Sequence, residues 1–276
     1  MKTLKQLLQQ PGPLVMGILN TTPDSFSDGG QYFTNKDATQ RIEAMLSAGA
    51  DIIDIGGEST RPGASEVSVA EELERVIPLV EVAKKSNAIV SVDTSKPEVM
   101  AAAIASGANM INDVRALQED GALEVVAAST AYVCVMHMQG QPRTMQNNPH
   151  YDDVVAEVQQ MLSQRITQCE SGGVERERIV VDPGFGFGKS LAHNTELMNN
   201  LSCFQSLACP ILVGVSRKTM IGQIVDKEVS ERMIGSVVAA SYAAMNGAKI
   251  LRVHDVEETV QAMKILKAFT NNKINN

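Results

Sequence analysis

Polar residues stand at the carboxyl ends of nearly all the short apolar runs in this 276-residue sequence. These residues are Asn20, Asp54, Asp93, Asn112, His137, Asp182, Ser216 with Lys218, and Arg252 with His254. If the runs are parallel strands of a barrel, their ends meet on one face, where the following loops build binding sites. A single Asp or Asn at a strand end often caps the next helix, and capping is the stronger interpretation for Asp54 or Asn112 taken alone. The recurrence of such residues at so many strand ends favours a shared polar site.

The basic residues of this set follow the last two apolar runs. Arg217 and Lys218 come after one run, and Arg252 lies at the end of the next. Loops after the last two strands are the usual place for phosphate in an eight-stranded barrel. Arg252 and His254 are two residues apart, so in an extended chain both point to one side and could bind oxygens of one diphosphate. The alternative for His254 is a buried histidine in an ordinary hydrogen bond.

Two long loops and a glycine-rich stretch complete the polar set. Residues 20–34 and 56–68 are longer than routine turns, which is typical of binding loops, although flexible surface is the alternative. Residues 182–189 (DPGFGFGK) lack the spacing of a nucleotide-binding loop, so we expect Phe185 or Phe187 to approach a flat ring. The sequence shows no catalytic-triad motif and no zinc spacing. The set therefore suits a heterocycle with amide edges and an anionic leaving group.

The elements that must position these residues alternate between apolar strands and amphipathic helices. We predict strands at 15–19, 52–55, 89–92, 110–111, 132–136, 179–181, 211–215 and 250–253. Helices are predicted between them, for example at 36–48, 69–85, 97–105, 153–170, 231–246 and 256–268. Eight strand–helix units predict an α/β fold, a single (β/α)8 TIM barrel, as one domain over residues 1–276. A doubly wound sheet with seven or nine units is the alternative.

Composition narrows the class of protein. The net charge of −8 and the pI of about 5.1 argue against binding to nucleic acid or to an anionic membrane. Hydrophobic residues make up 44% of the chain, enough for a large core. The four cysteines have no paired or metal-like spacing, and no run resembles a signal peptide or a membrane span. We therefore expect a cytoplasmic protein with free thiols.

Seven segments of the chain resemble the dihydropteroate synthase family. They are MGILNTTPDSFSDGG (16–30), DIGGESTRPG (54–63), SVDT (91–94), NDV (112–114), DPGFGFGK (182–189), GVSRK (214–218) and RVHD (252–255). The segments span nearly the whole chain in the family's order, and the first two are highly specific. The resemblance implies a (β/α)8 barrel, a homodimer and a target of sulfonamides. It also implies condensation of a dihydropterin methyl diphosphate with 4-aminobenzoate to give 7,8-dihydropteroate and diphosphate for folate synthesis.

The resemblance also assigns roles to individual residues. It implies a Mg²⁺ contact from Asn20, diphosphate contacts from Thr60, Arg252 and His254, pterin contacts from Asp93, Asn112, Asp182 and Lys218, a pterin slot lined by Met136, Phe187 and Gly214, and 4-aminobenzoate contacts from Arg61, Pro62 and Ser216. Within this set, catalytic roles fall to Asp93, Lys218, Arg252 and His254. These assignments make physical sense because a carboxylate can accept hydrogen bonds from a pterin amino group and a ring N–H.

Two other functions remain open at this stage. A folate-dependent methyltransferase would share the pterin-reading residues but would need neither the diphosphate-binding residues nor the STRPG loop. A pterin-binding barrel without catalysis would be expected to lack Asn20, Asp93 or Lys218, and the sequence retains all three. The STRPG segment has no insertion, so ordinary sulfonamide sensitivity is the expectation.

Overall fold

The strands form one closed parallel barrel. A computed structural model describes residues 2–21, 35–59, 66–140, 145–146 and 148–271. Within these ranges the strands pair in sequence order, from β1 to β8, and β8 pairs with β1. Their bounds are β1 (Leu14–Asn20), β2 (Ile52–Gly56), β3 (Ile89–Asp93), β4 (Met110–Asp113), β5 (Tyr132–Met136), β6 (Ile179–Asp182), β7 (Ile211–Val213) and β8 (Ala248–Val253). The predicted barrel is confirmed, and the open doubly wound sheet is excluded.

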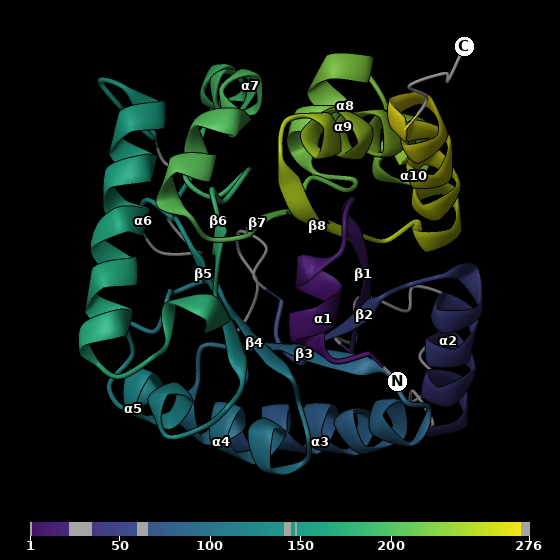
Figure 1. The fold of residues 1–276 in the computed structure, drawn as a ribbon, viewed down its shortest axis with the longest axis vertical. Coiled ribbons are helices and arrows are strands. Elements are labelled where there is room, and N and C mark those ends of the chain that lie inside the picture. Colours follow the sequence, from purple (N-terminus) through teal and green to yellow (C-terminus); the bar gives the residue numbers. More distant parts are fainter. Residues whose placement is uncertain (1, 22–34, 60–65, 141–144, 147, 272–276) are drawn as a thin grey trace.

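Helices surround the barrel on its outside (Figure 1). Their bounds are α1 (Leu4–Gln9), α2 (Asn35–Ala48), α3 (Val69–Lys85), α4 (Pro97–Ala105), α5 (Ala122–Ala127), α6 (Val154–Ser171), α7 (Leu191–Asn199), α8 (Thr219–Val225), α9 (Met233–Met245) and α10 (Val256–Asn271). Short 3₁₀ helices lie at Arg176–Arg178, Leu201–Leu207 and Val229–Glu231. Across the part of the chain described here, no helix has the length and apolar character needed to span a bilayer.

Side chains alternate between the two faces of each strand, as the pleat requires. One set, which includes Ile53, Val90 and Val133, packs outward against the helices in the larger core cluster. The alternate set, which includes Ile52 and Ile89, fills the barrel in a separate cluster. Two residues further along five of the strands, the inward positions are polar: Asp54, Ser91, Asn112, Asp182 and Arg252. The register thus places polar side chains on one level above an apolar floor.

Helix α1 closes the amino-terminal end of the barrel, and the sequence patterns above did not predict it. Leu4 and Leu7 of α1 belong to the same cluster as the barrel interior, and Figure 1 shows α1 lying across the middle of the helical ring. A capping box starts this helix, since Thr3 and Gln6 satisfy each other's backbone amides. The short amphipathic segment therefore acts as a plug for the end of the barrel opposite the strand carboxyl ends.

Strand β7 is shorter than predicted, ending at Val213 instead of Val215. Its pairing with β8 has a register irregularity at Ile211 and Leu212. Beyond Val213 the amide of His254 donates to the Ser216 side-chain oxygen at 3.1 Å, so a side chain replaces the ladder hydrogen bond. The polar end of this strand is consequently a loop that carries Ser216 and Lys218.

Because α1 is packed into the end of the barrel, we predict that it contributes to the free energy of unfolding. Leu4 is 3% exposed, so Leu4→Ala should lower the free energy of unfolding by about 2–5 kcal/mol through lost burial and a residual cavity. Urea denaturation measures this change. Gln9→Ala, at an exposed position of the same helix, is the control and should change stability by less than about 0.5 kcal/mol. Equal stability of the Leu4 variant and wild type would show that α1 does not seal the barrel.

Candidate active site

A buried ion-pair cluster occupies the carboxyl end of the barrel. The Arg252 guanidinium on β8 donates from Nε to Asp54 Oδ2 at 2.6 Å and from an Nη to Asp93 Oδ2 at 2.7 Å. Asn112 Nδ2 lies 3.3 Å from the same Asp54 oxygen. Neither Asp54 nor Asn112 caps a helix, so that interpretation is wrong. Both side chains point into the barrel and join β2, β4 and β8 through one polar network.

Burial and charge act in opposite directions on this cluster. Burial disfavours the charge of Arg252, but Asp54 and Asp93 more than offset this and raise the pKa of its guanidinium above the ordinary value. Burial raises the pKa of Asp93 to about 7, Arg252 opposes that rise, and the nearby Asp54 carboxylate adds to it. The cluster therefore holds a permanent cation and a carboxylate that changes its charge near neutral pH.

The second half of the site lies between β6 and β7. Lys218 Nζ donates to the carbonyl oxygen of Phe185 at 2.6 Å and lies 4.5 Å from the centre of the Phe187 ring. Burial lowers the pKa of Lys218 to about 8, while Asp182 favours its charged form. Asp182 is buried, accepts from the amide of Gly184 at 2.7 Å, and has a pKa raised by burial. A cation, a carboxylate and an aromatic face thus lie close together.

Phe185 and Phe187 separate into different roles. Phe185 is fully buried and packs in the core between barrel and helices, so the suggestion that it approaches a flat ring is wrong. Phe187 is partly exposed and remains available for that contact. Met136 is buried at the end of β5 and is the register partner of Asp182. Gly214 comes just after β7, where an added Cβ would lie 3.7 Å from Arg252 Cβ. These residues lie at the carboxyl end of the barrel strands, which we call the barrel mouth.

His254 and Ser216 are also brought together. His254 Nδ1 lies 3.1 Å from Ser216 Oγ, which also accepts from the His254 amide. Arg217, which the sequence groups with Lys218, turns away, because its backbone is left-handed (φ 58°) and its Nε donates to Asp255 Oδ2 at 3.0 Å. Arg252 thus contacts carboxylates inside the barrel, and His254 contacts Ser216 of the loop after β7.

One position near the mouth could accommodate a hard cation. A Cβ added to Gly56 would lie 3.3 Å from Asn20 Oδ1 and 3.9 Å from Asp93 Oδ2, so glycine keeps space open beside two oxygen atoms. Among the described residues no group of three or more His, Cys, Asp or Glu side chains could hold a metal. The donor set fits Mg²⁺, which takes few protein oxygens and completes its shell with water and phosphate.

Several predicted residues lie outside the described ranges. They are Thr60, Arg61 and Pro62, together with most of the loop 20–34. Asp54 is the main site residue that sequence reasoning left aside. The signal for it was a carboxylate at an inward-facing strand position, since Asp54 on β2 faces the same interior as Arg252 on β8.

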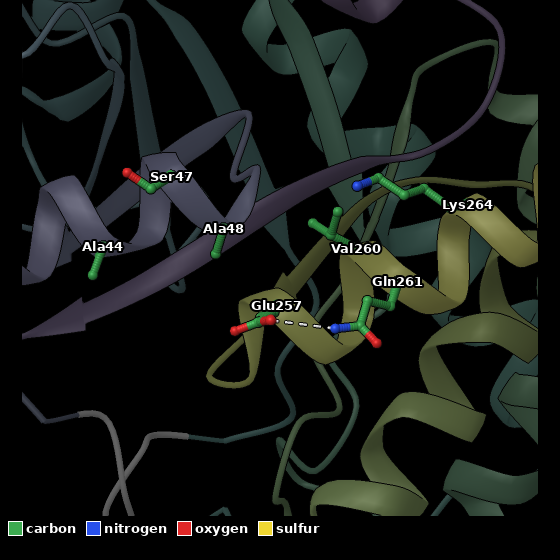
Figure 2. Close-up of a pocket in the computed structure, with 7 residues that line it drawn as sticks. All are labelled: Ala44, Ser47, Ala48, Glu257, Val260, Gln261 and Lys264. Carbon is green, nitrogen blue, oxygen red and sulfur yellow. Dashed lines mark hydrogen bonds between the residues drawn. The ribbon is translucent and has the colours of Figure 1, made fainter.

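A groove between α2 and α10 lies on the outer ring of helices instead of at the mouth (Figure 2). It encloses about 380 Å³ and is lined by Ala44, Ser47, Ala48, Glu257, Val260, Gln261 and Lys264. Glu257 accepts a hydrogen bond from Gln261 across one turn of α10. None of these residues belongs to the polar clusters at the mouth.

Comparison with known proteins agrees with this geometry. Residues 16–254 match the family model described as pterin binding enzyme. Dihydropteroate synthase of Escherichia coli (strain K12) is 54% identical over 264 residues, which cover 95% of this chain and 94% of that protein. The chain belongs to the pterin binding enzyme family, within the dihydropteroate synthases. This relationship makes it an enzyme of the transferase class.

Solved structures of this family share the fold closely. A Yersinia pestis dihydropteroate synthase in complex with a sulfonamide drug is 52% identical with a TM-score of 0.90, covering 94% of each chain. A Xanthomonas albilineans dihydropteroate synthase with 4-aminobenzoic acid is 49% identical with a TM-score of 0.89, covering 95% of this chain and 94% of the other. These relatives favour the synthase over the methyltransferase.

The raised pKa of Asp93 predicts a pH dependence of stability. Its pKa is about 7 in the folded protein against 3.8 ordinarily, so between these values the folded state binds more protons than the unfolded chain. The free energy of unfolding then falls as pH rises, and this contribution, fully present below about pH 4, is lost through pH 7. Wild type should therefore lose stability relative to Asp93→Asn between pH 4 and 8, as measured by urea denaturation at each pH. Asp120→Asn, at an exposed position, should give a curve parallel to that of wild type, and a parallel curve for Asp93→Asn would contradict the assignment.

Proposed function

We propose that this chain condenses (7,8-dihydropterin-6-yl)methyl diphosphate with 4-aminobenzoate, giving 7,8-dihydropteroate and diphosphate in folate synthesis. One observation carries the proposal: Asp93, Asn112, Asp182 and Lys218 converge from different strands on one mouth. A pterin presents both donors and acceptors along its edge, and this mixed set of carboxylates, amide and ammonium complements it. The identity to dihydropteroate synthases supports the choice of reaction.

The pterin would bind with its edge toward the carboxylates and its face toward Phe187. Asp54 Oδ1 and Ser91 Oγ are buried without a hydrogen-bond partner among the described residues. These two oxygens could therefore form further hydrogen bonds inside the barrel. Met136 and Gly214 would limit the width of the slot. Lys218 would donate to an acceptor on the ring while Asp182 keeps its ammonium charged.

The diphosphate would lie nearer to Asn20, Arg252 and His254, with Thr60 as a further contact. Asn20, beside the space that Gly56 keeps open, would contact Mg²⁺. When bound, the cation would add positive charge that stabilises the leaving diphosphate. Arg252 already forms ion pairs with Asp54 and Asp93, so we expect it to balance their charge as well as to bind phosphate oxygens.

The reaction breaks the bond between the pterin methylene carbon and the diphosphate oxygen. Diphosphate leaves with the electron pair, and positive charge spreads over the pterin. Asp93 in its ionised form would stabilise that charge, because it is held close and poorly hydrated. The 4-aminobenzoate nitrogen then supplies a pair to form the new carbon–nitrogen bond, and its proton leaves to diphosphate or water. Arg61, Pro62 and Ser216 would hold the aminobenzoate and help exclude competing water.

Release of diphosphate tests the proposed function directly. Purified protein with Mg²⁺ should release diphosphate only when both the pterin substrate and 4-aminobenzoate are present. Release without the aniline would indicate hydrolysis, and no release under either condition would indicate a binding protein. Complementation of a folate auxotroph separates the enzyme from a pterin-binding barrel without catalysis.

Asp93→Asn should lower kcat by about 100-fold or more, because the neutral amide cannot stabilise the pterin cation. Diphosphate binding should weaken far less, since Arg252 and His254 remain. Steady-state kinetics at saturating substrates measure the first effect, and inhibition by diphosphate measures the second. Near-normal turnover of the variant would contradict an electrostatic role for Asp93.

We also infer that the chain forms a homodimer through α9. Ile234, Val238, Tyr242 and Met245 recur at helical spacing on this helix and are 43% to 72% exposed. Phe269 on the neighbouring α10 is 75% exposed. An apolar stripe of this kind is typical of an association surface, and a second copy of the chain with twofold symmetry would cover both stripes at once.

A charged substitution tests the dimer. The double variant Ile234→Glu, Val238→Glu should sediment as a monomer at micromolar concentration, since it buries two carboxylates in the apolar contact. Gln261→Glu on α10, outside the stripe, serves as the control and should sediment as wild type does. A double variant with unchanged sedimentation would place the interface elsewhere, and a monomeric wild type would exclude the dimer.

Three smaller expectations complete the proposal. The chain should also bind sulfonamides, because the Yersinia pestis relative forms a complex with a sulfonamide drug. The cytoplasm is the expected location, supported by four free cysteines, three of them buried. The whole chain, residues 1–276, is expected to act as one pterin-binding domain that needs no nucleic acid or membrane.

A further inference from the structure

Lys189 is a buried cation to which the reaction above gives no role. Its side chain lies at the end of the glycine-rich loop 182–189, and the residue is 3% exposed. Nζ contacts the carbonyl oxygens of Gly184 at 2.9 Å and Phe187 at 3.0 Å, and His137 Nδ1 at 2.9 Å. An ammonium has three N–H donors, which match these three contacts, and the His137 carbonyl oxygen lies further away at 3.5 Å. Such a geometry fixes the nitrogen at one position.

The partner histidine is suited to this contact. Burial and the Lys189 charge lower the pKa of His137 to about 3, so its ring is neutral and Nδ1 can accept the hydrogen bond. Burial lowers the pKa of Lys189 to about 7, and the nearby Asp182 carboxylate partly offsets this by favouring the charged form. Burying an ammonium is costly, so its position depends on the hydrogen bonds that hold Nζ.

The backbone of the 182–189 loop, which Lys189 contacts, is tightly constrained. Gly184 has a left-handed backbone (φ 70°), and a Cβ there would lie 1.8 Å from the carbonyl oxygen of His137. The Gly186 amide donates to Asn194 Oδ1 at 2.7 Å, and Tyr151 donates to the carbonyl oxygen of Gly188 at 2.8 Å. The loop is thus pressed against the end of β5 and bound from several sides.

The same loop links Lys189 to the barrel mouth. The Phe187 carbonyl accepts from Lys189, and the Phe187 ring lies 4.5 Å from Lys218 Nζ. Lys218 in turn donates to the carbonyl oxygen of Phe185, which lies between Gly184 and Phe187, the two residues whose carbonyls Lys189 contacts. A change in the loop would therefore move the ring and the Lys218 ammonium together.

We propose that Lys189 is a positioning residue, which holds the 182–189 loop so that the Phe187 ring and Lys218 form the pterin slot. The proposal rests on the proposed function, because the slot is assigned to a pterin there. Lys189 acts through Phe187 and contacts no reacting atom. Its loss should weaken binding of the pterin substrate while leaving the use of 4-aminobenzoate nearly unchanged.

The test compares Lys189→Met with Tyr151→Phe, which removes one hydrogen bond to the same loop. Lys189→Met should raise the KM for the pterin diphosphate about tenfold or more, because three contacts of a charged donor are lost. The KM for 4-aminobenzoate should change less than twofold. Tyr151→Phe should change the pterin KM less than threefold. A Lys189→Met variant with a pterin KM within twofold of wild type, or with both KM values raised equally, would overturn the proposal.

A double-mutant cycle shows whether Lys189 acts through the ring. In a Phe187→Leu background, Lys189→Met should add less than a threefold increase in the pterin KM, and a full tenfold addition would contradict the proposal. If Lys189→Met does not fold, Lys189→Gln keeps two donors without the charge and should raise the same KM at least threefold. A pterin KM within twofold of wild type for that variant overturns the proposal.

Failure of the proposed function is separable from failure of this inference. If wild type releases no diphosphate with both substrates, the proposed function fails, and calorimetric binding of 7,8-dihydropteroate to wild type and Lys189→Met replaces the KM comparison. Weaker binding by the variant then supports the positioning role, whereas equal binding, or none by wild type, overturns it.

Discussion

The contact of Arg252 with Asp54 and Asp93 is the interaction on which the site depends. Its partners come from β2, β3 and β8, so the interaction forms only when the barrel closes in the observed register. Removing one partner would leave a buried charge uncompensated, which is strongly destabilising. The cluster therefore couples the fold to the electrostatics of the mouth. The Arg252 charge also opposes the rise that burial causes in the pKa of Asp93.

The other polar residues of the mouth come from different strands on different sides of this cluster. Asp93 and Asn112 lie on the side of β3 and β4, and Asp182 and Lys218 lie across the mouth on β6 and the β7 loop. His254 follows β8 and Asn20 is the last residue of β1, on the side where a diphosphate would leave. The division follows from topology, because each strand delivers its last inward residue to one level. A flat heterocycle and an anionic group can then bind on different sides of the barrel mouth.

The sequence predicted the barrel because parallel strands buried on both faces read as apolar runs with polar ends. It could not identify Asp54 as part of an ion pair, since its partner Arg252 is 198 residues away. Helix α1 is short, and its apolar residues matter only beneath a closed barrel. The apolar stripe on α9 was not predicted because most of that segment is apolar on all sides, so only the structure distinguishes its exposed face. Nothing in the sequence indicates that Lys189 is buried, because its contacts depend on the fold of the loop and on His137.

The claim that the mouth stabilises a pterin cation is tested most directly by positional isotope exchange. The pterin diphosphate would carry ¹⁸O in the oxygen that bridges the methylene carbon and phosphorus, and it would be incubated with enzyme and Mg²⁺ without 4-aminobenzoate. Reversible departure of diphosphate would move the label into non-bridging positions of recovered substrate, which mass spectrometry or ³¹P NMR detects. We predict exchange in wild type and a large reduction in Asp93→Asn. Turnover by wild type with no exchange in recovered substrate, or equal exchange in both proteins, would contradict the account.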